Sequence, residues 1–243
     1  MIKFFRRIRQ RLLIENKLRK YMVYASGEII LVVIGILIAL SINNWNEARK
    51  LEQVEFDILR GIKQNILMDT IDLNHNRRRF VEMNMRDSTV INYLMEKRPL
   101  DSIVEGHLTD LWRSNITLTL HTSYFDEAKT KGLSIISNKE LRDSISRLYE
   151  FRYDLVLHVE NNSRQYDYLT MYENLATDYV HLNAQTGKIV IGDAYYQTIL
   201  QDDLFTWKLL SANLKVRSVA QYYEEAYVAA ISVLDQIDAE LMR

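Results

Sequence analysis

An uninterrupted apolar segment near the N-terminus constrains this chain more than any other feature. It covers residues 29–42, and only Gly35, Ala39 and Ser41 interrupt its large apolar side chains. Fourteen residues are too few to cross a hydrocarbon layer about 30 Å thick, so a spanning helix would recruit residues from both flanks. We therefore predict a transmembrane helix over residues 21–44, with aromatic residues near both ends as interfacial anchors.

The charges around this segment predict its orientation. Residues 1–20 carry eight lysine or arginine residues and one acid, Glu15. Because positively charged flanks stay on the cytoplasmic side, these residues form a basic cytoplasmic arm, and residues 45–243 lie beyond the membrane. Of the 31 basic and 32 acidic residues in the chain, 23 and 31 remain after residue 20. This acidic remainder argues against binding to nucleic acid.

A cleaved signal peptide is the competing interpretation of the same segment. Ala39-Leu40-Ser41 has the small-x-small pattern that precedes a cleavage site. The region before the apolar run is 28 residues long, however, and a helical pattern continues directly past the run. These observations favour a signal anchor that stays in the membrane.

One face of the predicted span has the composition of a helix–helix contact. At 100° per residue, Tyr24, Glu28, Gly35 and Ala39 fall close to one line. The small pair Gly35-x-x-x-Ala39 lets a second helix approach closely. Glu28 lies on the same stripe, and an acid in a span either has a function or reaches back to the interface.

The remainder of the chain is predicted to be all-α. It holds one proline, and three long stretches keep apolar residues at a spacing of three and four: residues 45–97, 138–184 and 203–243. The last is the most regular, as in a bundle seam or coiled coil. We predict one N-terminal transmembrane helix that continues into an elongated antiparallel bundle of three long helices and short capping helices.

This up-down-up path also predicts where the connecting segments lie. Residues 99–137 are expected to cap the end of the bundle far from the membrane. Residues 185–202 are expected to lie near the membrane surface. Residues 45–243 then form one extracytoplasmic domain.

Residue patterns for catalysis, cofactors or metals are absent from the sequence. There is no cysteine, the five histidines lack the spacing of a metal site, and no glycine-rich phosphate loop occurs. We therefore predict no catalytic, cofactor-binding or metal-binding residue and a protein that is not an enzyme. The irregular cap is the best candidate for a partner or ligand surface, because function concentrates in loops on rigid scaffolds. Its candidate residues are Trp112, His121, Tyr124, Phe125 and Lys131.

Two stretches resemble a known family. Residues 1–47 include the run Gly27-Glu28-Ile-Ile-Leu-Val-Val-Ile-Gly-Ile-Leu-Ile-Ala-Leu-Ser-Ile-Asn-Asn-Trp45, and residues 124–142 read Tyr-Phe-Asp-Glu-Ala-Lys-Thr-Lys-Gly-Leu-Ser-Ile-Ile-Ser-Asn-Lys-Glu-Leu-Arg. Both resemble recurring segments of the domain-of-unknown-function 6090 family of Bacteroidota membrane proteins. The resemblance implies a single-pass bacterial inner-membrane protein with a cytoplasmic N-terminus and a periplasmic helical domain. It implies no activity.

Three functions remain open at this stage. The first is a protein-interaction or scaffold module, with the lipid bilayer and either a second copy or another membrane protein as partners. The second is a periplasmic ligand-sensing module. The third is an accessory subunit of a membrane complex, which rests on Glu28 alone.

Overall fold

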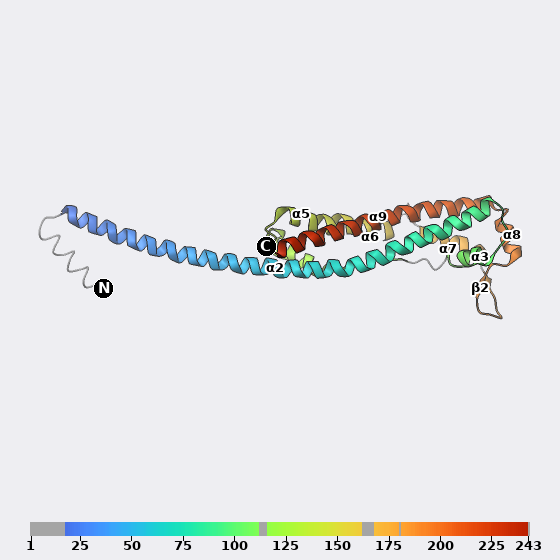
Figure 1. Ribbon diagram of the computed structural model, residues 1–243, viewed down its shortest axis with the longest axis horizontal. Coiled ribbons are helices and arrows are strands. Elements are labelled where there is room, and N and C mark those ends of the chain that lie inside the picture. The colour runs from blue at the N-terminus through green and yellow to red at the C-terminus, as the bar shows by residue number, and fades with distance from the viewer. Residues whose placement is uncertain (1–17, 112–115, 162–167, 180, 243) are drawn as a thin grey trace. The chain divides into compact units, whose positions relative to one another are not determined.

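The computed structural model describes residues 18–111, 116–161, 168–179 and 181–242. The chain divides into two compact units, residues 1–54 (unit 1) and residues 55–243 (unit 2). The described residues are mainly helical, with one small hairpin, so the predicted all-α class is confirmed. Figure 1 shows the helices of unit 2 lying side by side, with α9 along the C-terminal part of α2.

The elements follow one another in a simple order. The first helix, α2, runs from Leu18 to Met95, as the uninterrupted helical pattern predicts. The others are α3 (Ser102–Thr109), α4 (Ser123–Lys131), the 3-10 turn η2 (Leu133–Ile135), α5 (Lys139–Arg147), the π-helical turn η3 (Leu148–Tyr153), α6 (Asp154–Asn161), α7 (Tyr168–Tyr179), β1 (His181–Leu182), β2 (Ile189–Val190), α8 (Asp193–Ile199) and α9 (Asp203–Leu241).

The end of α2 has an identifiable cause. Lys97 adopts a positive φ of 49°, and the Arg98 amide donates to the carbonyl of Tyr93 at 3.0 Å. This closes the last turn in the manner of a Schellman motif. Pro99 follows and cannot continue the helix.

Two seams with a seven-residue repeat build the core of unit 2. On α2 every position of the repeat from residue 55 to residue 94 is buried: Glu55, Leu59, Ile62, Ile66, Asp69, Leu73, Asn76, Phe80, Met83, Asp87, Val90 and Leu94. We call this set the inner seam. The matching seam of α9 is Phe205, Leu209, Ala212, Val216, Val219, Tyr223, Ala226, Ala230, Val233, Ile237 and Glu240, all buried. The spacing of four and three presents both rows to one side of their helices.

Cross-helix contacts show that α9 runs antiparallel to α2. Lys63 pairs with Asp238, Arg77 with Glu224 at 2.7 Å, and the Asn213 amide with Asn84 at 3.1 Å. Phe80 and Tyr223 place their rings 5.1 Å apart in the centre of the same interface. The up-down-up path predicted that α9 would run parallel to α2, so the observed antiparallel direction corrects that prediction.

The helical stretch predicted over residues 138–184 also runs in the direction opposite to the prediction. Residues 116–122, which we call the connector, are extended and run back along α2: the Thr117 carbonyl meets Asn76 and the His121 amide meets Asp69. The chain therefore returns to the end where α2 enters unit 2 before α5 begins. As a result α5, α6 and α7 run parallel to α2 and antiparallel to α9.

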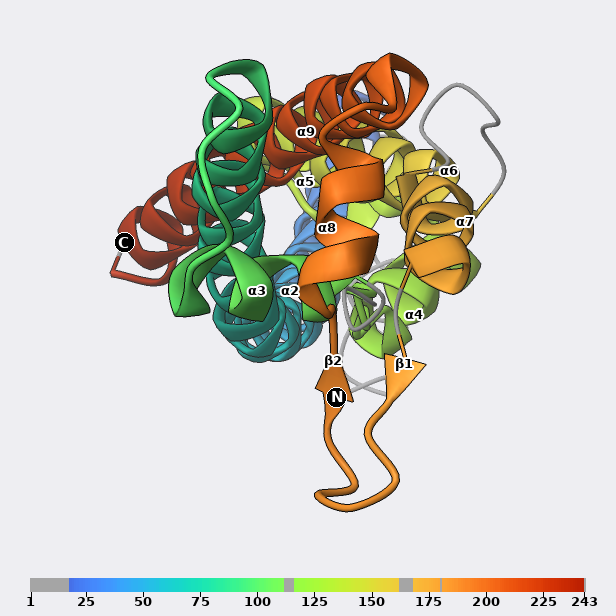
Figure 2. The same cartoon turned by 90° about the vertical axis from the view of Figure 1, so that its right-hand side faces the viewer.

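This return path corrects the placement of both connecting segments. Residues 123–138 lie at the end of unit 2 where α2 enters, because Ser137 bonds to Glu55. Residues 181–202 lie at the opposite end, where the Tyr196 hydroxyl donates to the carbonyl of Arg98 at 3.0 Å. Figure 2 looks at that end and shows α3, α8 and the projecting β1–β2 hairpin.

The predicted long helix over residues 138–184 is also corrected. It begins at Lys139, contains the π-helical turn η3, and its last described helix, α7, ends at Tyr179. The antiparallel pair β1–β2 follows, with His181 opposite Val190 and Leu182 opposite Ile189. The absence of glycine and proline favours a helix through residue 184, but residues 181 and 182 instead pair with β2 in the hairpin.

A close approach fixes α4 against α2. A Cβ atom built on Gly61 would lie 2.2 Å from Cδ1 of the Tyr124 ring. The ring therefore packs directly on the backbone of α2, where only glycine leaves room. In contrast, a Cβ on Gly106 of α3 would meet nothing within 4 Å.

We expect Gly61→Ala to lower the free energy of unfolding by about 1–3 kcal/mol, because the Tyr124 ring must move away. Gly106→Ala is the matched control and should raise it by about 0.4–1 kcal/mol through the unfolded state. Urea unfolding followed by circular dichroism measures both. Equal effects of the two changes would contradict the close packing of Tyr124 on α2.

Candidate functional site

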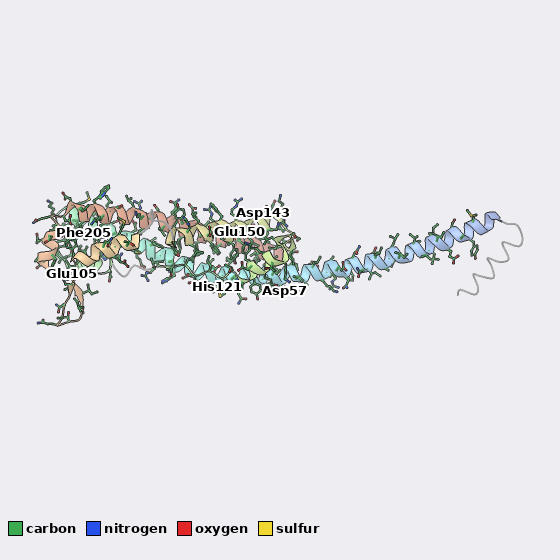
Figure 3. The ribbon with its side chains drawn as sticks, turned by 180° about the vertical axis from the view of Figure 1, so that it is seen from behind. Asp57, Glu105, His121, Asp143, Glu150 and Phe205 are labelled. Atoms are coloured by element: carbon green, nitrogen blue, oxygen red, sulfur yellow. The ribbon has the colours of Figure 1, made fainter. Side chains whose placement is uncertain are left out.

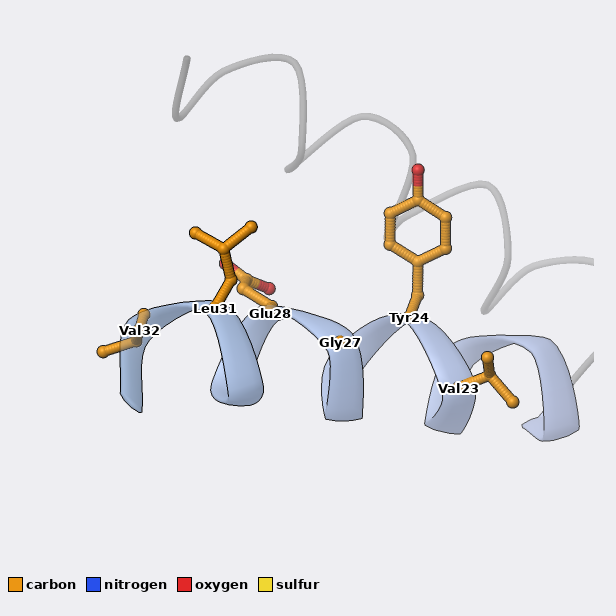
Figure 4. Close-up of a pocket in the computed structure, with 6 residues that line it drawn as sticks. All are labelled: Val23, Tyr24, Gly27, Glu28, Leu31 and Val32. Atoms are coloured by element: carbon orange, nitrogen blue, oxygen red, sulfur yellow. The ribbon is translucent and has the colours of Figure 1, made fainter. Parts of the chain in front are cut away.

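The predicted stripe lies on an exposed helix face in unit 1. Tyr24, Glu28, Gly35 and Ala39 are all exposed, and a Cβ built on Gly35 would meet no atom within 4 Å. Tyr24 and Glu28 help to line a surface hollow on this helix, together with Val23, Gly27, Leu31 and Val32 (Figure 4). Gly35 and Ala39 lie farther along the helix and complete the small-residue pair.

The helix that carries this stripe is a candidate membrane span. It is the one helix in the described part of the chain that is long and apolar enough to cross a membrane. None of its apolar window is buried inside the protein. Large apolar side chains from Ile29 to Ile42 are therefore exposed throughout this run.

In the cap, His121 holds the connector against α2 through two contacts to Asp69. Its Nδ1 lies 2.9 Å from Oδ1 of Asp69, and its backbone amide donates to the same oxygen at 2.9 Å. Asp69 is completely buried, whereas the imidazole is partly exposed. The hydroxyl of Tyr149 donates to the His121 carbonyl at 3.4 Å.

The aromatic residues of the cap contact other parts of unit 2, with Phe125 buried and Tyr124 38% exposed. Phe125 stacks on Tyr149 with ring centroids 4.4 Å apart, and Tyr153 meets Tyr149 edge-on at 5.2 Å. Tyr124 covers Gly61. The structure thus brings His121, Tyr124 and Phe125 together around α4, where they close the bundle.

The two remaining cap candidates differ from these three. Lys131 is exposed and pairs with Glu127 of its own helix at 3.8 Å. Trp112 lies outside the described residues. Figure 3 places His121 toward one end of unit 2 and Glu105 and Phe205 at the other.

Sequence reasoning missed the groups that hold the connector. Its backbone amides donate to side-chain carboxylates: Leu118 to Glu160 at 3.2 Å, and Thr119 to Asp72 at 2.8 Å. The Asn76 amide donates to the carbonyl of Thr117 at 2.9 Å. These side chains thereby form hydrogen bonds with peptide groups of a single extended segment that has no sheet partner. Buried peptide groups require such partners.

A signal for these contacts existed in the pattern. Asp69 and Asn76 are polar positions one heptad apart in a mainly apolar seam, and residues 116–120 alternate as an extended segment does. Extended residues advance about 3.3 Å each, and helical residues 1.5 Å each. Four extended residues therefore cover about 13 Å and seven helical residues about 10.5 Å. These lengths are close enough for Thr117 to meet Asn76 and for His121 to meet Asp69.

A second buried acid links three helices near the other end of unit 2. Asp87 of α2 accepts a hydrogen bond from the Tyr172 hydroxyl of α7. The Asn213 amide of α9 lies 3.5 Å from the same oxygen, Oδ2. Oδ1 faces Nε of Arg86 at 3.5 Å. The inner seam therefore carries polar layers that hydrogen-bond in a specific register.

Burial dominates the electrostatics of these acids. It raises the pKa of Asp69, Asp87 and Glu160 above the ordinary carboxyl range, although hydrogen bonds from His121, Tyr172 and Tyr223 oppose the shift. Burial, reinforced by the nearby charge of Asp69, also raises the pKa of Tyr149 and Tyr153.

The chemistry available to this cluster is limited. Asp69 Oδ2 and the Tyr153 hydroxyl are buried without a hydrogen bond of good geometry to any described residue. No group of three acidic or histidine side chains in the described ranges is arranged to hold a metal. The Asp69–His121 pair joins the connector to α2 and aligns no described nucleophile.

We expect Asp69→Ala to lower the free energy of unfolding by about 1–3 kcal/mol, because the buried His121 contacts lose their acceptor. Asp143→Ala on the exposed face of α5 is the control, and it should stay within about 0.5 kcal/mol of the parent. Chemical denaturation of both variants provides the comparison. A loss as large for Asp143 as for Asp69 would refute the role of the buried carboxylate.

The raised pKa values of Asp69, Asp87 and Glu160 predict that unit 2 is more stable at pH 5 than at pH 8. The folded state binds these protons more tightly than the unfolded state, so their contribution is complete below the unfolded pKa. It is lost as the pH rises through the folded pKa. Asp87→Asn removes one titrating group while retaining its shape, and should raise the melting temperature at pH 8 more than at pH 5.

Two partly exposed N-cap aspartates, Asp101 of α3 and Asp202 of α9, define the lower limit of this pH window. Hydrogen bonds lower the pKa of Asp101 and Asp202, so their contribution is lost only as the pH falls through those lowered values. These lie below the ordinary aspartate pKa of about 4. Asp143→Asn serves as the control substitution. A melting temperature that rises from pH 5 to pH 8 would show that the buried acids do not govern this window.

Comparison with known proteins places the chain in a family. A family model described as Family of unknown function (DUF6090) matches residues 28–200, which begin in the apolar helix and end after α8. No curated protein and no solved structure matches the chain. The matched range contains the connector and all of its bonded partners, whereas α9 follows it. Because the match covers well over half of the 243 residues, this protein belongs to the family of unknown function DUF6090.

Proposed function

We propose that this protein is a single-pass inner-membrane protein whose periplasmic helical bundle is a protein-interaction or scaffold module. The observation that carries the proposal is the complete exposure of the apolar run from Ile29 to Ile42. Exposed large side chains over four turns are unfavourable in water by about 25 cal/mol per Å², and a bilayer removes that cost. The basic residues 1–20 support a cytoplasmic N-terminus.

The cap supports a scaffold more than a ligand sensor. His121, Tyr124 and Phe125 are engaged by Asp69, Gly61 and Tyr149 of the same chain. These contacts within the chain hold the three side chains in place, although His121 and Tyr124 keep part of their surface exposed. The role of an accessory subunit rests on Glu28, which lines the hollow of Figure 4.

We expect single-cysteine reporters to reveal a signal anchor with its N-terminus inside, since the native chain has no cysteine. Ser232→Cys, exposed on α9, should react with an impermeant maleimide once the outer membrane is opened. Lys3→Cys should react only after the inner membrane is permeabilised. Alkaline carbonate should leave the protein in the membrane pellet.

Other results would overturn this proposal in identifiable ways. Carbonate extraction of the protein would exclude the span. If the mature protein were smaller than the full chain and lacked the label at Lys3→Cys, a cleaved signal peptide would be established. Purification in mild detergent, followed by mass spectrometry, measures association. A monomer that retains no other protein would contradict the interaction module.

A further inference from the structure

The outer surface of α2 carries a second row of residues with the spacing of a helix–helix seam. We call this row the outer seam; its residues alternate at intervals of four and three. They are Leu67, Ile71, Asn74, Arg78, Val81, Met85, Ser88, Asn92 and Met95. Five of the nine are large apolar residues exposed to solvent, including Ile71 at 73% and Met85 at 64%. The row has the same four-and-three spacing as the inner seam, which is buried against other helices of its own chain.

We propose that the outer seam of α2 binds the outer seam of a second copy in parallel, so that the protein is a homodimer. The proposal rests on the membrane anchorage proposed above and names the partner of the module. Two copies held in one bilayer leave it on the same side, which favours parallel pairing. In a parallel pair each residue of the seam meets its own equivalent, so Ile71 packs on Ile71 and Met85 on Met85.

Charge beside the outer seam agrees with the parallel register. In a parallel pair, residues at the flanking positions meet a residue five positions farther along the other chain. Arg77 and Glu82 have this offset and opposite charges. Glu82 is exposed and makes no ion pair with described residues, whereas Arg77 already contacts Glu224 at 2.7 Å. In the parallel pair, Arg77 of the second copy lies beside Glu82 while it keeps its contacts to Glu224 and Asn74. This opposite-charge pair offsets the repulsion between the two Arg78 side chains.

The polar positions within the seam also suit a dimer. Asn74 and Asn92 occupy seam positions on either side of the Val81 and Met85 pair. A buried asparagine layer in a parallel coiled coil fixes register and limits the number of strands, at some cost in stability. The outer seam thus combines apolar contact with residues that disfavour shifted pairings.

The exposed face of α9 is the other apolar row of unit 2, and charge disfavours it as a parallel interface. Trp207, Leu214 and Val228 are exposed on α9. Between them, a parallel pair would place Arg217 against Arg217 and Glu224 against Glu224. Two opposed like-charge layers weaken such a pair. This face therefore supplies the control position.

Disulfide trapping in the cysteine-free full chain tests the proposal. Ile71→Cys and Met85→Cys, each in intact membranes, should form a disulfide-linked dimer on mild oxidation, because a disulfide requires Cα atoms about 5–6 Å apart. Val228→Cys has a similar exposure, 56%, and should give several-fold less dimer. An adduct of a different mass at residues 71 and 85, or equal trapping at residue 228, would overturn the homodimer.

A second measurement keeps the test independent of trapping. Ile71→Asp together with Met85→Asp should convert the purified protein from dimer to monomer without changing its helical content, since both side chains are exposed in unit 2. Val228→Asp should remain a dimer. A dimer that survives the double substitution, or a native protein that is monomeric, would overturn the outer seam as the interface. Neither result would alter the membrane location measured by the cysteine reporters.

Discussion

The hydrogen bonds between the connector and carboxylates of two helices determine how unit 2 is put together. Leu118 and His121 donate their backbone amides to Glu160 of α6 and Asp69 of α2. Without such acceptors an extended segment in a helical bundle would bury unpaired peptide groups, at about 1–3 kcal/mol each. Because the connector can lie there, the chain runs back along the part of α2 that belongs to unit 2 before α5 begins. The parallel relation of α5–α7 to α2 follows from that path.

The same acids explain why the bundle has one register. A wholly apolar seam packs almost equally well after a shift of seven residues, since the repeat is preserved. Asp87 finds Tyr172 and Asn213 in only one alignment, and Asn76 finds Thr117 in only one. A shifted bundle would leave these groups buried without partners. Burial raises the pKa of each of these carboxyls, so keeping them ionised at neutral pH lowers the free energy of unfolding. This loss is the energetic cost of the specific register.

Local periodicity was sufficient to predict the long helices. The four-and-three spacing of α9 and of α2 depends only on residues near in sequence, and both helices form as predicted. The direction of α5–α7 depends on where residues 116–122 bind, a contact that spans about fifty residues. Asp69 and Asn76 are polar residues in a mainly apolar seam, and several of their partners are backbone groups of the connector, which a sequence does not distinguish. The predicted cap lies at the end of unit 2 where α2 enters rather than at the far end, and there Tyr124 packs on Gly61 and Phe125 stacks on Tyr149.

The two sides of α2 within unit 2 differ in whether their apolar residues have partners in the same chain. The inner seam is completed by α9 and the connector within one chain, and its polar layers are satisfied there. The outer seam repeats the spacing but keeps its apolar residues exposed. Helix propensity does not require Ile71 or Met85 on a solvated face, where charged residues serve equally well. A helix that contains the apolar N-terminal segment and carries a second seam on its exposed side can therefore link anchorage to self-association.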